Sequence, residues 1–360
     1  MAPASGERFY IVGAGPAGAG AALAASRLGM KPIVYEAMDR PAVKPCGRGI
    51  PVLRDLWFAR IPRDAVLNRI RSAVMYVNGE FLFELRGVFE GYIVDKSLML
   101  ESLIVESGGE IVYRSKYDPR TGYVKTPLDF VRVKSGILAG GNLFYGGEKI
   151  MAVQWILGGR GVGESDTLEI YFDTDLLGYY YVFPHGPGEV EVGVGGFAEG
   201  SRLRRLLEAF IRSREDLRGA ERLRFEGAKI AIGGLDLGYV NGLVKVGEAA
   251  GFVMPLTGEG IRPSMISGFV AAKALIEGVD PIEALRGSSI GRAIELQKAI
   301  LNYVKGLNSG ERARILRALG PRAHAEIALG TMNRSVLARE LARSRVLSTL
   351  LRIMLSKLGM

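Results

Sequence analysis

The sequence predicts a mixed α/β fold, α+β overall, in which a parallel-sheet domain is interleaved with an antiparallel sheet and followed by a helical segment. Three observations predict this fold: a glycine-rich strand–helix–strand unit over residues 8–36, strand-like segments rich in β-branched and aromatic residues over 167–197, and a basic, helical stretch from residue 281 onward. Nucleotide-type units that alternate with antiparallel strands are typical of two domains whose chain segments interleave.

The first unit has the pattern of a Rossmann-like dinucleotide site. An apolar run leads into Gly13-x-Gly15-x-x-Gly18, an alanine-rich helix follows, and a second apolar run ends in Glu36. Gly13 permits the tight turn, Gly15 lets the backbone approach a pyrophosphate, and Gly18 lets the helix pack closely on the sheet. The helix N-terminus then faces the phosphate charge, and Glu36 is placed to accept hydrogen bonds from a ribose. An ordinary glycine-rich turn would not explain the acid.

A second strand–turn–helix segment follows much later in the chain. An apolar strand ends in Gly247-Glu248, and the run Pro255–Gly260 opens a helix that continues through Ile261. Ligands of open α/β sheets bind at such strand ends, and the helix N-terminus gives positive potential. The segment alone could be an ordinary βα turn. Two such turns in one chain favour a large cofactor such as FAD.

The remaining segments predict further elements. Asn78-Gly79 predicts a hairpin within residues 72–87. We expect helices near 96–107 and 201–216, and a glycine-broken loop followed by a helix over 44–60. The run 184–188 interrupts the later strands, so we expect His185 to lie in an exposed turn. We assign no role to His324.

Composition excludes several classes of protein. The 360 residues can hold two or three domains, and the one cysteine, Cys46, excludes a disulfide framework, a zinc ribbon, a CxxC redox pair and a cysteine-ligated iron–sulfur cluster. We predict no metal site. The sequence shows no signal-peptide pattern and no apolar run of the roughly 18 residues that span a bilayer. We therefore expect a cytoplasmic protein that is not integral to a membrane.

The net charge of +9 comes from the end of the chain, because residues 281–360 hold fourteen Lys or Arg and five Glu. This segment has leucines at helical spacing with arginines between them, for example over 337–358. A basic amphipathic helix can lie on an anionic membrane, so we consider peripheral contact with the inner membrane face. The simpler alternative, which we favour, is a helix that packs on its own protein. Nothing resembles a nucleic-acid-binding motif.

Three motifs together resemble the geranylgeranyl reductase family, within the wider FAD-dependent group that includes aromatic hydroxylases. They are IVGAGPAG, KPCGRGIP and VGEAAGFVMPLTGEGI, and the resemblance covers roughly residues 8–280. Tyr179-x-Tyr181-x-Phe183-Pro184 is similar to the family's substrate-cavity motif, with Tyr181 where Trp is usual. The resemblance implies an extended FAD with its pyrophosphate on the first glycine loop. It implies cofactor contacts from Gly13, Gly15, Ala17, Gly18, Glu36, Cys46, Gly47, Lys96, Gly247, Glu248, Pro255, Gly258, Gly260 and Ile261.

The chain departs from the family pattern in three places. Glu248 occupies the place of the family's usual Asp and is one methylene longer. Lys96 occupies the place of an arginine that contacts FAD; it keeps the positive charge but lacks the bidentate fork of a guanidinium. The family's Asp-Gly pair is not evident, and residues 139–141 occupy the nearest equivalent place. The missing Asp-Gly pair bears on how a nicotinamide donor approaches more than on FAD.

The resemblance also implies which residues act near the substrate. We expect Cys46, Tyr179 and Tyr181 to be catalytic, and Phe183 and Pro184 to bind substrate. The alternatives are an inert buried cysteine and tyrosines that only pack in the core. Tyr179 and Tyr181 share one strand face, where they would line an apolar tunnel suited to a long isoprenoid.

The activity that the resemblance implies is the saturation of C=C bonds in geranylgeranyl chains of archaeal-type lipids or isoprenoid precursors. Partners would be a prenyl lipid or prenyl diphosphate and an electron donor, NAD(P)H or ferredoxin. Two alternatives remain: an FAD-dependent monooxygenase of a hydrophobic substrate, and a non-catalytic FAD-binding, membrane-associated protein. We expect a discontinuous FAD-binding domain over residues 1–70, 88–150 and 228–280. The antiparallel substrate domain is expected over 71–87 and 151–227, and a basic helical segment over 281–360.

Overall fold

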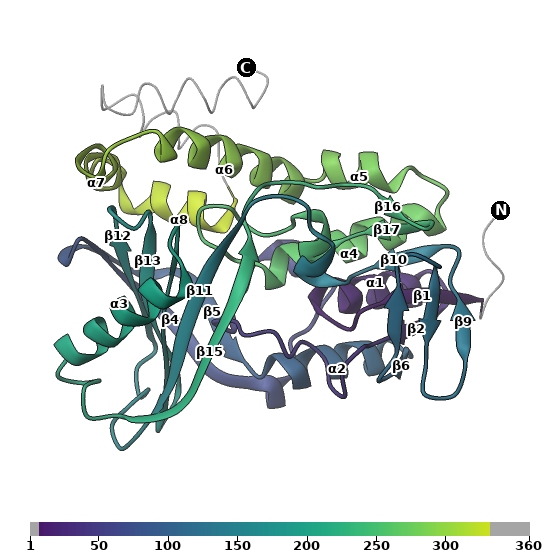
Figure 1. The fold of residues 1–360 in the computed structure, drawn as a ribbon, viewed down its shortest axis with the longest axis horizontal. Coiled ribbons are helices and arrows are strands. Elements are labelled where there is room, and N and C mark those ends of the chain that lie inside the picture. The colour runs from purple at the N-terminus through teal and green to yellow at the C-terminus, as the bar shows by residue number, and fades with distance from the viewer. Residues whose placement is uncertain (1–6, 332–360) are drawn as a thin grey trace.

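Two large sheets stand side by side in the computed structural model, which describes residues 7–331 (Figure 1). The first has six strands, and neighbouring strands run parallel except for one antiparallel pair at its edge. In spatial order these are β16 (Tyr239–Val240), β17 (Leu243–Lys245), β10 (Gly136–Leu138), β1 (Arg8–Val12), β2 (Lys31–Tyr35) and β6 (Glu110–Val112).

The parallel sheet is the middle layer of three. Because side chains alternate along a strand, Ile11 and Val34 face the helices while Val12 and Ile33 face the other way. The helices of this domain are α1 (Pro16–Arg27), α2 (Lys96–Glu106) and α4 (Ile261–Ile276). The opposite face is covered by a small antiparallel sheet, β7 (Lys116–Asp118), β8 (Tyr123–Lys125) and β9 (Phe130–Arg132).

Helices α1 and α4 cross at glycines. A Cβ added to Gly20 would lie 2.0 Å from the carbonyl oxygen of Met265, and one added to Gly268 would lie 1.8 Å from that of Ala17. Both separations are far below any van der Waals contact. Only glycine therefore lets the two backbones approach so closely, within the first two turns of α1 and the second and third turns of α4.

The second sheet has eight strands and is antiparallel apart from one pair. Strands β12 and β4 run parallel. In spatial order the strands are β15 (Glu221–Ala231), β11 (Lys149–Gly158), β14 (Glu189–Gly196), β13 (Gly178–Gly186), β12 (Thr167–Asp173), β4 (Val66–Val77), β5 (Glu80–Val94) and β3 (Gly49–Pro51).

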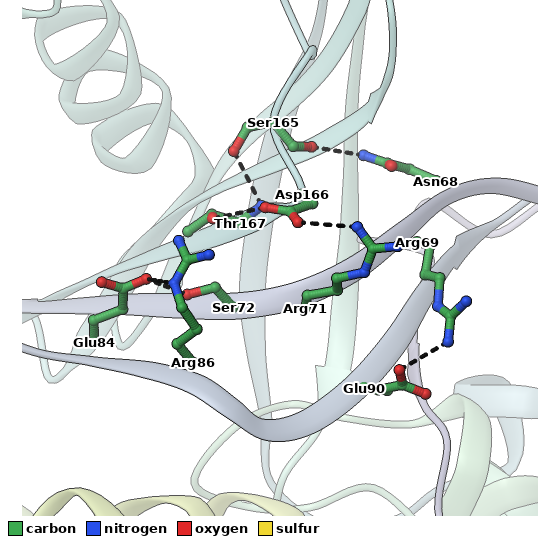
Figure 2. A network of polar contacts seen from close by, with 10 residues as sticks. All are labelled: Asn68, Arg69, Arg71, Ser72, Glu84, Arg86, Glu90, Ser165, Asp166 and Thr167. Carbon is green, nitrogen blue, oxygen red and sulfur yellow. Dashed lines mark hydrogen bonds and ion pairs between the residues drawn. The ribbon is translucent and has the colours of Figure 1, made fainter.

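A polar network surrounds the start of the parallel β12–β4 pair (Figure 2). Ser72 Oγ and Arg86 Nε donate to Glu84 Oε1 at 2.7 and 2.9 Å, and these bonds lower the pKa of the Glu84 carboxyl. Asn68 Nδ2 donates to the carbonyl oxygens of Ser165 and of Pro184 at 2.9 Å each. The network thus fixes the end of β13 as well as the two parallel strands.

The faces of the eight-stranded sheet differ. One face packs on α3 (Gly200–Ser213), whose Leu203, Leu207 and Ile211 are fully buried against valines of β13 and β14. The other face borders a cavity. Four further helices run from the parallel-sheet domain to this end of the molecule (Figure 1): α5 (Pro281–Gly287), α6 (Ser289–Lys305), α7 (Ser309–Ala318) and α8 (Pro321–Leu329).

Most of the predicted elements are confirmed. The first strand–helix–strand unit, the helices near 96–107 and 201–216, and the helix that opens at Ile261 are present. Asn78 and Gly79 join β4 to β5 with positive φ angles of 51° and 84°, as a tight hairpin requires. The chain is helical from 281 to the end of the described residues, and the predicted stripe over 337–358 lies outside them.

Two predictions are wrong. The α-helix predicted in the second part of 44–60 is absent: the chain there forms the short strand β3, which pairs with β5, and a 3₁₀ turn, η1 (Arg54–Leu56). His185 does not lie in an exposed turn. Strand β13 continues through Gly186, and the His185 side chain is only 2% exposed, because the interruption is confined to Pro187–Gly188.

The eight-stranded sheet extends beyond the ranges 71–87 and 151–227. It also takes in Gly49–Pro51, the start of β4 from Val66 and the end of β5 to Val94, because these segments continue the ladder. The division of the chain into domains stays a proposal. A division that follows the two sheets would assign these segments to the substrate domain.

The α1–α4 crossing gives a prediction on stability. Gly268→Ala places a methyl group against the Ala17 carbonyl, so we expect it to lower the free energy of unfolding by about 1–3 kcal/mol. Chemical denaturation of the purified protein measures the change. The control is Gly287→Ala, whose Cβ would meet nothing within 4 Å and should be neutral or slightly stabilising. Equal stability of both variants would contradict the packing argument.

Candidate functional site

A cavity of about 1350 Å³ lies between the two sheets. At one end its wall contains both glycine-rich turns, with Gly13, Gly15 and Gly258. At the other end the wall is aliphatic and comes from β4, β5, β12 and the helices α6–α8. Its volume exceeds the roughly 300–1,000 Å³ that is usual for pockets of drug-sized ligands, so it has room for more than one small molecule.

The three glycines of the first loop differ in what surrounds them. A Cβ on Gly13, whose φ is +99°, would lie 2.4 Å from the Ala139 carbonyl oxygen, and a Cβ on Gly18 would lie 2.0 Å from that of Gly13. Both glycines are required by the fold itself. A Cβ on Gly15 would meet nothing within 4 Å. Gly15 is also the N-cap of α1 without a side-chain cap, so the backbone amides there face open space.

Glu36 closes the first loop from the end of β2. Its Oε2 accepts a hydrogen bond from the Ala14 amide at 2.8 Å, and its Oε1 accepts one from the Met38 amide at 2.9 Å. The residue is 9% exposed and lines the cavity. A carboxylate has about four acceptor positions, so two amide donors leave capacity for hydroxyl groups. Glu36 therefore fixes the glycine loop and still offers acceptors to a ligand.

Glu248 is engaged by protein groups in the second turn. Lys44 Nζ lies 2.6 and 2.5 Å from its two oxygens, and the Ala231 amide donates to Oε1 at 3.0 Å. This pair joins the KPCG loop to the turn after β17, and both side chains line the cavity. Gly260 caps α4 without a side-chain hydrogen bond, as Gly15 does for α1. Both uncapped helix N-termini thus border the same cavity.

Lys96 and Cys46 shape the KPCG loop. Lys96 Nζ donates to the Lys44 carbonyl oxygen at 2.5 Å, and the Arg48 amide donates to Cys46 Sγ at 3.3 Å. A Cβ on Gly47 would lie 2.8 Å from Phe183 Cε2, so glycine is required where the loop meets the aromatic side chains. The loop therefore lies between the first sheet and β13, with Cys46 in the cavity wall.

Three aromatic residues of β13 form a row along the cavity face. The Tyr181 ring lies 6.2 Å from that of Tyr179 and 4.8 Å from that of Phe183, centre to centre. The Tyr179 hydroxyl donates to the Thr257 carbonyl oxygen, and the Tyr181 hydroxyl donates to Gln154 Oε1 at 2.8 Å. Burial raises the pKa of Tyr179 to about 12 and that of Tyr181 well above its usual value, so both phenols stay protonated near neutral pH.

The structure brings most of the predicted site residues together. Of those predictions, Gly18, Gly247 and Pro184 do not line the cavity: Gly18 packs on Gly13, the Gly247 amide donates to Ser267 Oγ, and the Pro184 carbonyl accepts from Asn68. The roles of all of them stay predictions. The predicted site residues that do line the cavity are Gly13, Gly15, Ala17, Glu36, Cys46, Gly47, Lys96, Tyr179, Tyr181, Phe183, Glu248, Pro255, Gly258, Gly260 and Ile261.

Sequence reasoning missed the wall that the C-terminal helices form. Ile315, Leu319 and Ala325 of α7, the following turn and α8 line the far end of the cavity, opposite Met75 and Leu85. His324 also lines it, and burial lowers the pKa of its imidazole. Apolar helical spacing could have identified a buried face, but nothing in the pattern says whether that face covers a core or a cavity.

A buried arginine fixes the second turn to the rest of the molecule. Arg262, fully buried at the start of α4, pairs with Glu259 at 2.7 Å and with Asp55 of η1, and donates to the Leu329 carbonyl oxygen at 2.5 Å. A buried guanidinium needs such partners, because an unpaired buried charge is very costly. Arg262 therefore connects the Pro255–Gly260 turn to α8.

No group of three or more His, Cys, Asp or Glu residues within 7–331 is arranged to hold a metal ion. No helix in the same range is both long and apolar enough to cross a bilayer.

Solved structures share this fold. A geranylgeranyl bacteriochlorophyll reductase-like protein from Thermoplasma acidophilum superposes with a TM-score of 0.80 at 20% identity, over 96% of this chain and 99% of that one. A flavoprotein/dehydrogenase from Cytophaga hutchinsonii gives a TM-score of 0.72 at 14% identity, over 98% and 100%. The fold is thus one that flavoproteins use.

Sequence relatives narrow the class further. No protein-family model matches the chain. The chain is 28% identical to digeranylgeranylglycerophospholipid reductase 2 of Methanothermobacter thermautotrophicus over 355 residues, which are 86% of this chain and 90% of the relative. The predicted resemblance to the geranylgeranyl reductase family is therefore confirmed: the chain is a homologue of proteins that carry this name.

The open space at Gly15 gives a prediction on ligand binding. Gly15→Ala should leave the melting temperature unchanged, because its methyl group meets no protein atom, yet weaken FAD binding on the order of tenfold by filling the place of the pyrophosphate. Calorimetric titration of the purified protein with FAD measures the affinity. Gly219→Ala, also in open space but away from the cavity, is the control. Unchanged FAD affinity of Gly15→Ala would contradict the assignment.

Proposed function

We propose that the cavity binds FAD, with its pyrophosphate at the N-terminus of α1 and its isoalloxazine ring near the N-terminus of α4. Two uncapped helix N-termini that face one cavity suit a ligand with an anionic centre and an electron-accepting ring. Glu36 keeps acceptor capacity for a ribose. The open position at Gly15 is the observation that fits the cofactor best, because the fold itself does not require a glycine there.

Glu248 would contact the cofactor as a carboxylate that is already bound by protein groups. Its carboxylate already binds Lys44 and the Ala231 amide, so it would meet a cofactor hydroxyl as part of an ion pair. Lys96 likewise acts on the KPCG loop through the Lys44 carbonyl. Both departures from the family pattern therefore hold the loop that carries Cys46 in place, in addition to any direct contact with FAD.

We propose further that the protein saturates C=C bonds of geranylgeranyl chains in archaeal-type lipids or their precursors. One observation carries this proposal: the cavity runs from the glycine loop past Tyr179, Tyr181 and Phe183 to an aliphatic wall under α7 and α8. A long apolar chain fits such a space, and a small polar substrate does not require it. The names of the curated relatives support the same activity.

In the reaction, bound reduced FAD would supply the hydride. The chain's own residues would orient the substrate, because the aromatic row of β13 and the aliphatic wall hold a prenyl chain along the cavity. Burial excludes water from the reacting carbons. Cys46 of the KPCG loop and the protonated phenols of Tyr179 and Tyr181 lie in the same wall and are the candidates to act on the alkene.

Two further proposals concern the electron donor and contact with a membrane. We propose NAD(P)H or ferredoxin as the donor. A membrane supplies a glycerolipid substrate, so we also propose peripheral contact through the basic segment 281–360. Within that segment α6 to α8 pack on the protein and form part of the cavity wall, so membrane contact by the described residues would involve the outer faces of these helices.

An anaerobic assay tests the proposed activity. Dithionite-reduced, FAD-loaded protein should convert a digeranylgeranyl glycerophospholipid to products heavier by two hydrogens per double bond, as measured by mass spectrometry. The control is the same mixture without protein. A mass gain that requires oxygen would favour the monooxygenase alternative. A yellow protein that no substrate reoxidises would favour a non-catalytic FAD-binding protein.

A further inference from the structure

A buried carboxyl group on β14 has no hydrogen-bond partner. Glu191 is 0% exposed, and neither of its carboxyl oxygens has a hydrogen-bond partner among the described residues. Burying a polar group without partners costs a few kcal/mol, on the order of 1–3 in proteins. Burial also raises the pKa of this carboxyl. A group so costly to the fold, and able to hold a proton at a higher pH than an ordinary glutamate, calls for a functional explanation.

His185 stands between Glu191 and the solvent. Its Nδ1 lies 2.7 Å from Glu189 Oε1, and its Nε2 lies 3.3 Å from Glu191 Oε2. The second contact is within ion-pair distance, but its geometry is not that of a hydrogen bond. The Glu189 side chain is 40% exposed, that of His185 2%, and that of Glu191 0%. Three titratable groups therefore lead in two steps from the surface to the interior.

A bulge at the end of β13 gives His185 this position. Pro184 pairs with Val190 and Gly186 with Glu189, so His185 is the extra residue without a partner in the ladder. Bulges redirect side chains and are frequent beside active sites. Asn68 fixes the bulge from β4 by its hydrogen bond to the Pro184 carbonyl.

The inner end of this series lies next to residues that line the cavity. Glu191 lies opposite Phe183 in the β13–β14 ladder and Gly193 lies opposite Tyr181, so all four residues share the face that borders the cavity. A Cβ on Gly47 would lie 3.6 Å from Glu191 Oε1. The negative charge of an ionised Glu191 is one cause of the raised pKa of Tyr181. Glu191 is therefore directly behind Tyr181 and the KPCG loop.

The charges around Glu191 come from several elements. His185 and Arg48 of the KPCG loop favour its ionised form, whereas Glu226 of β15 and the surrounding burial oppose it. Glu189 faces the other side of the imidazole. Burial outweighs the favourable charges, so the carboxyl keeps its proton to higher pH than usual and loses it as the pH rises through the elevated pKa.

We propose that Glu189, His185 and Glu191 form a proton relay that resupplies Tyr181 during reduction of the double bond. This inference rests on the proposed function. One alkene carbon receives the hydride that the proposed cofactor supplies, while the Tyr181 O–H bond breaks and a C–H bond forms at the other carbon. The phenolate takes the proton of the Glu191 carboxyl, Glu191 takes one from the Nε2–H group of His185, and Nδ1 of His185 takes one that solvent water delivers through Glu189, which leaves hydroxide in the solvent. The imidazole then exchanges its tautomer, so that Nε2 again carries the proton. Each double bond then gains two hydrogens and the relay returns to its starting state.

The first test is the pH profile of the FAD-loaded protein in the anaerobic assay. The relay needs protonated Glu191, so the wild-type rate should decline as the pH rises through the elevated pKa of this carboxyl. Glu191→Gln keeps the shape of the side chain but has no acidic proton to transfer. Its rate should be lower on the order of tenfold or more, and it should not show that decline. His185→Gln should slow the reaction as well. Glu84→Gln, a carboxylate of the same sheet outside the relay, should keep the wild-type rate and profile. FAD content should equal the wild type in all three.

The second test does not depend on activity. The chain has two histidines, so ¹⁵N-histidine spectra contain only His185 and His324. In the wild type Glu191 becomes negative beside the imidazole only as the pH rises through its elevated pKa, so the ¹⁵N shifts of the His185 ring should report that step. Glu191→Gln should abolish this step at His185 and leave the His324 signals unchanged. A wild-type rate and profile in Glu191→Gln, or His185 signals that this substitution leaves unchanged at every pH, would overturn the relay. A wild type that saturates no prenyl chain would instead overturn the proposed function, and with it the task of the relay.

Discussion

The close crossing of α1 and α4 is the constraint on which the rest of the structure depends. Gly20 and Gly268 remove the side chains that would separate the two helices, and the contact lies in the N-terminal half of each helix. Their N-termini are therefore held at the same cavity, each with a glycine as N-cap and no side-chain cap. Positive potential from two helices is thus concentrated where the chain has left open space.

Two contacts then join this centre to the eight-stranded sheet. The Lys44–Glu248 pair connects the KPCG loop to the second turn, and the Tyr179 hydroxyl donates to the Thr257 carbonyl of the same turn. A charged pair that is partly shielded from water is stronger than a neutral hydrogen bond, so the loop with Cys46 is held firmly. The cavity wall is consequently built from both sheets, and the cofactor and substrate ends share one enclosed space.

Sequence reasoning predicted the parts that depend on local chemistry. Glycines at fixed spacing identified both turns, and Asn78-Gly79 identified the hairpin, because each motif needs particular backbone angles within a few residues. It could not predict what depends on distant contacts. Glu248 meets Lys44 from 204 residues away, and His185 is buried because its ring packs beside Glu191 of the neighbouring strand. The wall from α7 and α8 was missed for the same reason: helical spacing shows an apolar face and not what it covers.

The central claim is that the cavity recognises a dinucleotide through its pyrophosphate and ribose, rather than a flavin ring alone. Fluorescence titration of the apoprotein with FAD, FMN and riboflavin tests it most directly. The account predicts one FAD per chain and an affinity that falls in the order FAD, FMN, riboflavin, because only FAD reaches both Glu36 and the N-terminus of α1. Equal affinity for riboflavin and FAD, or no binding of any of them, would contradict it.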